Sequence, residues 1–344
     1  MLKAHESPYI KILHYDNANI FIKAISHKGE LYELFDDHFI FRGHSTDKYE
    51  LVPSALRSHL VFENEKPVEF TSEEERELYV YLATTEYAQI TEEYKLLQEF
   101  FRICDKSGLY VPHIENLRNS FYPGFDVKML LLEHPWIPKD YWELAALAQH
   151  HGVKTRLLDW SYDIFVALYF ATKGVYYDPK EKQDLGKALK AHMKVKDFSP
   201  KQNMELWALN TDVVMIKPTQ VPLHIIQPRY YNNDNLRAQK GVFTFWDSIY
   251  PALFKKNGKL DIRAMTDRRT LDVQLDSYLK KNKVHETPFL YQITIPQDAA
   301  YGIYSYIEKM GYNASTIFPG YDGVAKYMKE HREIHHKGVK IIKL

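Results

Sequence analysis

Hydrophobic and polar residues along the chain follow strand and helix periods in separate segments. Early in the chain they alternate locally, and the segment HFIFRGHS (residues 38–45) has the pattern of a strand that runs into a glycine turn. Residues 71–104 begin with acids after Thr71 or Ser72, a suitable N-cap, and their apolar residues recur at helical spacing. These patterns predict a strand that carries arginine and glycine at its end, followed by one helix or two.

The middle of the chain predicts a helix, a strand and a second helix in direct succession. Residues 139–152 carry a helical stripe of leucine and alanine that Gly152 terminates. The segment VKTRLLDW (residues 153–160) has the composition of a strand, and residues 163–174 have that of a helix with Asp163 as its N-cap. We therefore expect a strand-turn-helix unit here.

The second half of the chain contains several short strand patterns. MELWALN, VPLHIIQP and GVFTFW predict strands of a second sheet region, and PFLYQITIP predicts a further strand. Towards the C-terminus, AYGIYSYIEKMG predicts a helix ended by Gly311, and GVKIIKL predicts a closing strand.

Many short strands mixed with helices indicate an α+β fold with mixed, largely antiparallel sheets and helical insertions. We place a helical insertion at residues 60–140 and a polar, lysine-rich excursion at residues 175–205.

Composition narrows the class of protein only a little. The 344 residues contain 45 lysines and arginines and 45 aspartates and glutamates, so the net charge does not indicate nucleic-acid binding, although local basic patches stay open. The single cysteine, Cys104, excludes an internal disulfide and a cysteine-based zinc site, which suits a reducing cytosol. Neither a signal peptide nor a membrane-length apolar run is evident, so we expect a cytoplasmic protein without a membrane partner.

Most common catalytic motifs are absent from the sequence. Neither a glycine-rich phosphate loop nor a Gly-x-Ser-x-Gly elbow occurs. His331 and His335 lie four residues apart and would share one face of a helix, but a zinc site needs further ligands, and the glutamate of a metalloprotease signature is missing. A polar C-terminal turn is the favoured interpretation, and we expect no metal.

The polar residues that stand out are gathered in three islands. The first is Phe41-Arg42-Gly43, followed by a Pro-Ser step and an arginine within residues 53–57, and the second is QHHGVKTRLLDW (residues 149–160). The third contains Gln239, Gly241 and Phe243. Together they resemble the FRG domain family, which is named for its Phe-Arg-Gly motif and has a Gln-His-x-Gly-x-x-Thr-Arg-Leu-Leu-Asp-Trp block. The resemblance implies a single FRG-type domain over residues 1–344.

A second resemblance suggests a mechanism. Arginine-type ADP-ribosyltransferases have a strand ending in aromatic-Arg-Gly and a Ser/Thr-bearing strand that runs directly into a helix, and FIFRG, TRLLDWS and ALYFA are the analogues here. This resemblance implies an ADP-ribosyltransferase-like core with NAD as the substrate, in which Arg42 grips a pyrophosphate or ribose and Thr155 or Ser161 holds the nicotinamide ribose. The family's third-strand carboxylate has no counterpart, because Gln239 stands near its place and an amide cannot act as a general base. Asp159 is the substitute that we expect.

We derive two sets of candidate site residues from these resemblances. The catalytic candidates are Arg42, His150, Asp159 and Gln239. The cofactor-binding candidates are Arg42, Gly43, His44, Gln149, Thr155, Arg156, Trp160, Ser161 and Phe243. His150 is favoured over the adjacent His151, because the family pattern carries histidine at the first of the two positions.

Arg156 and Asp159 admit a structural interpretation as well as a functional one. Residues three apart on a strand point to opposite faces, so each would pair elsewhere, and Arg42 is an obvious partner for Asp159. The functional interpretation rests on convergence, because Arg42, Gln149, His150 and Asp159 all end predicted elements where a cleft would open.

Three functions stay open on the sequence alone. The first is an NAD-dependent ADP-ribosyltransferase or NAD glycohydrolase that acts in stress or phage defence or as a toxin-like effector, with a small-molecule nucleotide and an unknown acceptor as partners. The second is a non-enzymatic nucleotide- or partner-binding module, and the third is a nuclease or other phosphoester hydrolase that uses His150 and Asp159. Carboxylates discriminate among them: a transferase needs one against the ribose, a metal-dependent nuclease needs a set, and a binding module needs none.

Overall fold

A computed structural model gives the fold of the chain. It describes residues 7–36, 38–57, 72–119, 127, 130–131, 135–177, 202–216, 221–231, 233–247 and 264–342. Within these residues no helix is long and apolar enough to cross a membrane.

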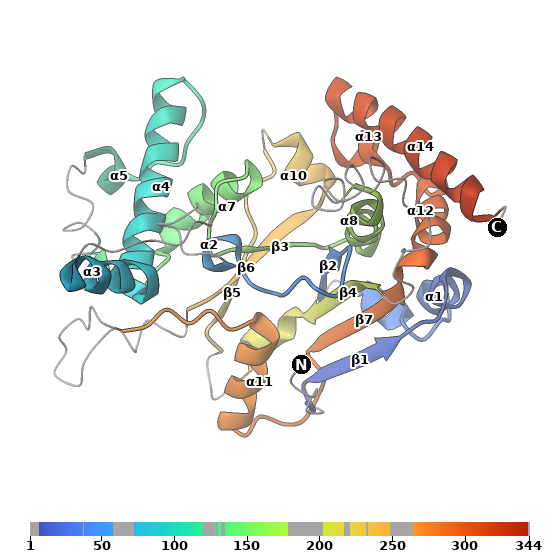
Figure 1. The fold of residues 1–344 in the computed structure, drawn as a ribbon, viewed down its shortest axis with the longest axis horizontal. Helices are drawn as coiled ribbons and strands as arrows, with labels where there is room; N and C mark the ends of the chain where they lie inside the picture. Colours follow the sequence, from blue (N-terminus) through green and yellow to red (C-terminus); the bar gives the residue numbers. More distant parts are fainter. Residues whose placement is uncertain are drawn as a thin grey trace.

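One mixed sheet of seven strands runs through the described chain (Figure 1). Its strand order is β1-β7-β4-β2-β3-β6-β5, in which β1 and β7 pair in parallel and all other neighbours pair antiparallel. The strands are β1 (Ile10–His14), β2 (Phe39–His44), β3 (Leu158–Ser161), β4 (Asn203–Asn210), β5 (Leu223–Ile226), β6 (Gly241–Trp246) and β7 (Leu290–Pro296). The predicted α+β class is confirmed.

Helices cover this sheet on both faces and at one end (Figure 1). They are α1 (Ala18–Ile25), α2 (Ser54–Arg57), α3 (Glu73–Thr84), α4 (Glu86–Lys106), α5 (Glu115–Asn119), α7 (Trp142–His150), α8 (Ile164–Tyr177), α10 (Asp234–Ala238), α11 (Leu271–Lys281), α12 (Ala300–Lys309), α13 (Ala314–Ile317) and α14 (Tyr321–Ile342). Short 3₁₀ helices lie at Tyr32–Phe35, Lys139–Tyr141, Thr211–Met215 and Gln297–Ala299.

Successive side chains of β2 are buried in two different hydrophobic clusters. Phe39 and Phe41 are buried in a cluster with residues of α1, α8 and α12, whereas Ile40 is buried in a cluster with Leu275 of α11. Successive side chains of a strand point to opposite faces, so Arg42 leaves the strand on the face of Ile40. A third cluster joins α4 and α7 to β5 and β6.

Several helix boundaries lie where the sequence predicts them. The segment over residues 71–104 forms two helices, and Ser72 caps the first by accepting a hydrogen bond from the backbone N–H of Glu75 at 3.1 Å. Asp163 caps α8 in the same way, because its carboxylate accepts from the backbone N–H of Phe165 at 2.9 Å. Left-handed glycines follow α7 and α12, with Gly152 at φ +87° and Gly311 at φ +92°.

Other expectations about the strands are wrong. The strands predicted at MELWALN, VPLHIIQP and GVFTFW join the same sheet as β2, because β4 pairs with β2 along all six residues of β2. Gly43 lies within β2, which continues to His44, so no turn begins at the glycine. The strand expected at residues 153–160 begins only at Leu158.

The C-terminal segment forms a helix instead of the expected closing strand. Helix α14 continues through Ile342, so most of GVKIIKL is helical and the polar C-terminal turn around His331 and His335 is also helical. Once a helix has formed, each further residue adds one backbone hydrogen bond, and this gain outweighs the weak strand preference of a short apolar run.

The predicted domain organisation falls partly outside the described residues. Of the helical insertion at 60–140, residues 60–71 and most of 120–134 lie outside them, as do residues 178–201 of the polar excursion. Both edges of that excursion belong to regular elements, because α8 extends to Tyr177 and β4 begins at Asn203. The single-domain assignment stays a prediction.

Candidate functional site

A cavity opens where two neighbouring strands part. Strands β2 and β3 share only one pair, Phe41 with Ser161, although β3 pairs with β6 along its whole length. Beyond that pair lies a cavity of about 450 Å³, a size typical of small-molecule sites. Its lining residues are Phe41, Arg42, Gly43, Gln149, His150, His151, Asp159, Trp160, Ser161, Val166, Ala167, Phe170, Asn235, Leu236, Gln239, Gly241, Phe243 and Phe318.

Most of the residues singled out in the sequence meet at this cavity, although they come from segments 200 residues apart. Four sources supply them: β2, the end of α7, β3, and the α10–β6 junction. The candidates that line the cavity are Arg42, Gly43, Gln149, His150, Asp159, Trp160, Ser161, Gln239 and Phe243. His44, Thr155 and Arg156 are not among its lining residues.

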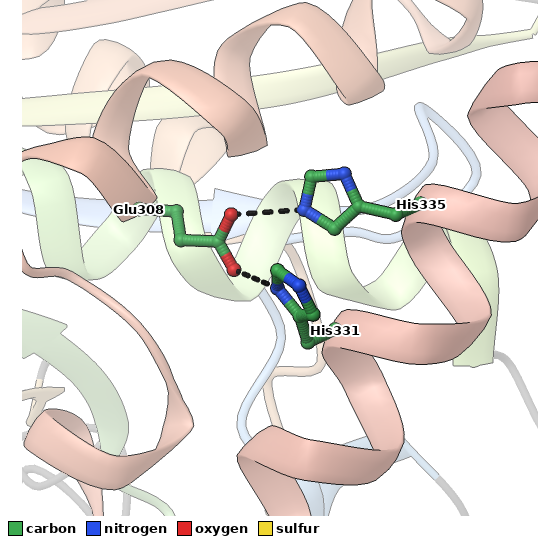
Figure 2. Close-up of side chains that lie close together, drawn as sticks. All are labelled: Glu308, His331 and His335. Atoms are coloured by element: carbon green, nitrogen blue, oxygen red, sulfur yellow. Dashed lines mark hydrogen bonds and ion pairs between the residues drawn. The ribbon is translucent and has the colours of Figure 1, made fainter.

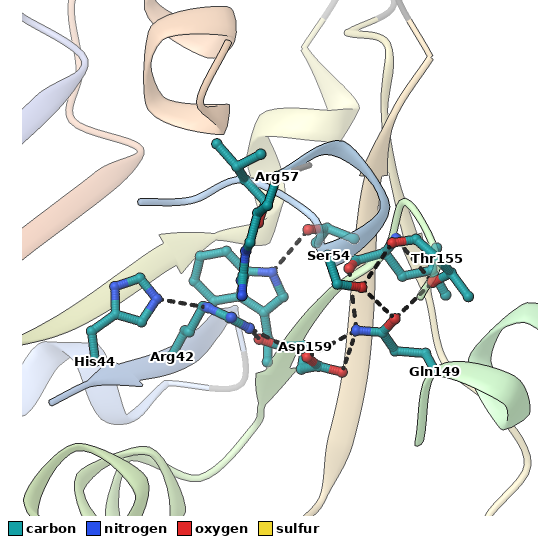
Figure 3. A network of polar contacts seen from close by, with 11 residues as sticks. Arg42, His44, Ser54, Arg57, Gln149, Thr155 and Asp159 are labelled. Carbon is teal, nitrogen blue, oxygen red and sulfur yellow. Dashed lines mark hydrogen bonds and ion pairs between the residues drawn. The ribbon is translucent and has the colours of Figure 1, made fainter. Parts of the chain in front are cut away.

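Arg42 bridges the gap between the two parted strands (Figure 3). Its Nη1 donates to the backbone oxygen of Asp159 at 2.6 Å and lies 3.5 Å from the Asp159 carboxylate, and its Nε donates to Nε2 of His44 at 2.9 Å. Burial lowers the pKa of Arg42, and the nearby charge of Arg57 acts in the same direction, against Asp159. A guanidinium keeps its charge in such surroundings, so the cavity wall carries a fixed cation.

A second hydrogen-bonded chain holds Asp159 from the other side (Figure 3). The Gln149 amide nitrogen donates to the Asp159 carboxylate oxygens at 3.1 and 3.3 Å, and the Gln149 amide oxygen accepts from Thr155 Oγ1 at 2.8 Å. Thr155 does not line the cavity itself, but its hydrogen bond fixes the orientation of Gln149, which does. The Asp159 side chain remains 53% exposed, so its carboxylate is open to a ligand.

His44 and Glu205 help to fix the position of Arg42, because His44 contacts Arg42 and Glu205 lies next to His44. Because Nε2 of His44 accepts from Arg42, the ring is neutral and carries its proton on Nδ1, which lies 3.7 Å from the Glu205 carboxylate. Glu205 in turn accepts from the indole of Trp207 at 3.0 Å and the amide of Gln292 at 2.7 Å. Burial lowers the pKa of His44, which favours this neutral form.

This arrangement gives His44 a pH signature. A histidine whose folded pKa lies below its unfolded pKa contributes stability that is complete above the unfolded value, about 6.5, and is lost as the pH falls below it. We expect the melting temperature of the parent to fall between pH 6.5 and 5.5, and a His44→Gln variant to show a flatter profile. Thermal melts across this range, with the exposed His14→Gln as control, check this, and parallel profiles for parent and His44→Gln would refute it.

The glycine of the Phe-Arg-Gly motif allows α8 to approach β2. A Cβ added at Gly43 would overlap the backbone oxygen of Ala167, which a side-chain rotation cannot relieve. We expect Gly43→Ala to lower the free energy of unfolding by about 1–3 kcal/mol. The matched control is Gly241→Ala, also in a strand at the cavity, where the added Cβ meets the mobile Cδ1 of Leu236. Denaturant unfolding compares the two, and equal losses would contradict a specific role for Gly43.

His150 and His151 both line the cavity, at the end of α7. Their rings meet edge to face, with centroids 5.3 Å apart. Burial lowers the pKa of His150, the neighbouring His151 lowers it further, and Asp159 acts against both. His150 is therefore a neutral imidazole near pH 7, able to accept or donate a proton.

Arg156 does not take part in the cavity, although it was a cofactor-binding candidate. Its guanidinium pairs with two buried carboxylates, Glu86 at 2.7 Å and Glu93 at 2.8 Å. All three side chains are less than 5% exposed. The structural interpretation of the sequence thus describes Arg156 correctly. Its reason, that Arg156 and Asp159 lie on opposite faces of one strand, is wrong, because β3 begins at Leu158 and Arg156 precedes it.

The remaining candidates form the other walls. Ser161 Oγ donates to the backbone oxygen of Gln239 at 2.7 Å and accepts from the backbone N–H of Asp163 at 2.9 Å, so this hydroxyl ties β3 to the α10–β6 junction. The Gln239 side chain reaches the backbone oxygen of Ile317 at 3.4 Å. Trp160 donates its indole N–H to Thr244 Oγ1 at 2.8 Å and thereby fixes its ring.

Some residues at the site carry no clear signal in the sequence. Phe170 and Phe318 line the cavity from α8 and from the segment before α14, and apolar residues at such positions are indistinguishable from core residues. Glu205 does leave a signal, a single carboxylate within the apolar strand MELWALN, where a buried charge requires a partner.

The fold is α+β, and where its strands β2 and β3 part lies a polar cavity whose described lining includes one carboxylate, that of Asp159. A family model described as the FRG domain matches residues 88–181, about a quarter of the chain. The match includes the Gln149–Trp160 block, while the Phe-Arg-Gly residues of β2 precede it. Comparison with the curated proteins found no match, and comparison with the solved structures found none. The ADP-ribosyltransferase resemblance therefore stays a prediction.

Proposed function

We propose that the cavity binds a nucleotide and that NAD is consumed there, either by hydrolysis or by transfer of its ADP-ribose to an acceptor. The observation that carries this proposal is the contact of Arg42 with Asp159, which places a fixed guanidinium and an exposed carboxylate on one wall of a cavity that also holds aromatic rings. Guanidinium groups recognise pyrophosphate, aromatic rings accept planar bases, and a carboxylate suits a ribose.

Charge at the cavity supports an anionic ligand. The guanidinium of Arg57 points towards that of Arg42 (Figure 3), and its charge lowers the pKa of Arg42. Two cations held close together repel each other until an anion lies between them or beside them. Asp159 lies beside Arg42 and offsets part of this repulsion, and a diphosphate would offset more of it.

Asp159 is the group that would act on the ribose. In the proposed reaction the bond between C1′ and the nicotinamide nitrogen breaks, and the bonding electron pair leaves with neutral nicotinamide. The oxygen of water or of an acceptor hydroxyl bonds to C1′ and loses its proton, which the Asp159 carboxylate accepts. Gln149 and Arg42 would hold this carboxylate in place, and neutral His150 would orient the attacking hydroxyl.

The cavity offers less to the nuclease alternative. Among its described lining residues Asp159 is the sole carboxylate, whereas a metal-dependent nuclease needs a set of them. The binding-module alternative uses the same cavity but predicts that the bound nucleotide is not consumed. It therefore differs from the proposal only in the absence of a reaction.

Two assays on the purified chain test the proposal. A thermal-shift screen against NAD, ADP-ribose, AMP and inorganic pyrophosphate tests binding, because a ligand at a hundred times its dissociation constant adds about 2.7 kcal/mol of stability. Release of nicotinamide from NAD tests turnover. We expect stabilisation by NAD or ADP-ribose and measurable release of nicotinamide. Stabilisation without release would favour the binding module, and no shift with any of these nucleotides would contradict the proposal.

A further inference from the structure

Two imidazoles and one carboxylate meet between the last two long helices, away from the cavity (Figure 2). His331 and His335 extend from α14 towards Glu308 on α12. Nδ1 of His331 lies 2.9 Å from Glu308 Oε1, and Nε2 of His335 lies 3.0 Å from Glu308 Oε2. One ring nitrogen of each histidine and one carboxylate oxygen lie within 4.8 Å of one another.

Helix geometry explains why these three side chains converge. Residues four apart in a helix project from the same face, so the rings of His331 and His335 lie side by side, tilted by 51° with centroids 4.2 Å apart. Helix α12 packs against α14 and brings in Glu308. The sequence shows the two histidines but not the third ligand, because Glu308 lies in a different helix, 23 residues before His331.

A further contact fixes one of the rings. Nδ1 of His335 lies 3.3 Å from the hydroxyl of Tyr301, which is on α12 two turns before Glu308. When Nδ1 keeps its proton and donates it to Tyr301, Nε2 presents its lone pair towards Glu308. Histidines that bind metals in proteins have their other ring nitrogen hydrogen-bonded in this way.

The chemistry of the three ligands selects the class of metal. Two imidazole nitrogens and one carboxylate suit Zn²⁺ and its neighbours among the divalent transition metals, whereas Mg²⁺ and Ca²⁺ prefer oxygen ligands alone. Ligands about 2.1 Å from a tetrahedral ion lie roughly 3.4 Å apart. The three ligand atoms here lie within 4.8 Å of one another, so rotations of these side chains that change their separations by up to about 1.4 Å would complete the site. His331 is 47% and His335 31% exposed, which leaves the site open to an ion from solvent.

We propose that Glu308, His331 and His335 bind one divalent transition-metal ion of the Zn²⁺ class and that this ion links α14 to α12. Three protein ligands leave a fourth position for water or an exogenous ligand. The site is separate from the proposed nucleotide cavity, because none of its three ligands lines that cavity.

The test uses the full chain without a polyhistidine tag, freed of metal by a chelator. We expect calorimetric titration with Zn²⁺ to give one tight site per chain, Co²⁺ to give the visible absorption of a site with nitrogen and oxygen ligands, and Mg²⁺ to give neither. His331→Ala and His335→Ala should each weaken Zn²⁺ binding at least tenfold, and Glu308→Gln should weaken it because the amide carries no charge. The control His14→Ala removes an exposed histidine that lies beside Asp16 and should bind Zn²⁺ as the parent does.

Two results would overturn the proposal. One is a parent chain that takes up neither Zn²⁺ nor Co²⁺ at one ion per chain. The other is unchanged tight binding in His331→Ala and His335→Ala, which would place the ion elsewhere. Circular dichroism of the metal-free variants shows whether they fold, and Glu308→Gln, which keeps the side-chain shape, provides the test if an alanine variant does not.

Discussion

Replacing Arg156 with methionine is expected to lower the free energy of unfolding by about 3–5 kcal/mol, because it removes a buried cation that pairs with two buried carboxylates. Burial alone would lower the pKa of Arg156, but Glu86 and Glu93 raise it above its ordinary value. Burial already raises the pKa of Glu86 despite Arg156. Without the guanidinium, both carboxylates would face each other inside the protein.

An exposed ion pair provides the control for this experiment. Arg118 makes two hydrogen bonds to the carboxylate of Asp105, at 2.8 and 3.0 Å, but the two side chains are 48% and 37% exposed. Arg118→Met should therefore cost less than about 1 kcal/mol. Denaturant unfolding of both variants measures the difference. Equal, small losses of unfolding free energy would show that the buried Arg156 stabilises the protein no more than an exposed ion pair does.

Replacing Asp159 with asparagine is expected to cut NAD consumption by about 10²–10⁴-fold, the range that a general base contributes. The same change should barely alter the melting temperature. The Asp159 side chain is 53% exposed, and the shortest bond that Arg42 makes here goes to the backbone oxygen of residue 159, which asparagine keeps. A loss of activity without a loss of stability separates catalysis from scaffolding.

Asp212 offers a matched control for Asp159. Its side chain is 54% exposed and pairs with His38 at 2.7 Å, outside the cavity. Asp212→Asn should consume NAD like the parent. Nicotinamide release and thermal melting are measured on the same preparations, and full activity in Asp159→Asn would exclude this carboxylate as the proton acceptor.

The local pattern of the sequence predicts most elements because local interactions determine them. Ser72 and Asp163 cap helices through hydrogen bonds to residues two or three positions away, and Gly152 and Gly311 adopt the left-handed conformation that ends a helix. None of these features depends on a distant part of the chain. They are therefore visible in a short window of residues.

Pairing between distant strands is not visible in such a window. The sequence suggests a second sheet region after residue 203, whereas the pairing of β4 with β2 joins everything into one sheet. The final helix shows the same limit, because the strand pattern of its last residues yields to continuation of a helix that begins at Tyr321.

The residues of the candidate site also divide into those that the sequence indicates and those that only the tertiary structure brings to the cavity. Motif residues such as Arg42, Gln149 and Asp159 are found from the sequence because they stand in the segments that carry the family resemblance and also end predicted elements. Other placements are not found from the sequence: Arg156 pairs with two glutamates on α4, and Phe318 lines the cavity although it lies 276 residues after Arg42 in the chain. Which polar residue faces a cavity and which faces a buried partner is decided by tertiary packing.

Calorimetric titration of the parent and of Arg42→Lys with NAD and ADP-ribose tests most directly whether the cavity is a nucleotide site. Lysine keeps the charge of Arg42 but lacks the planar fork that now reaches both His44 and the backbone of Asp159. We expect the parent to bind at least one of the two ligands, and the variant, still folded by circular dichroism, to bind it at least tenfold more weakly. Equal affinities for parent and variant, or a parent that binds neither ligand, would contradict a nucleotide site at Arg42.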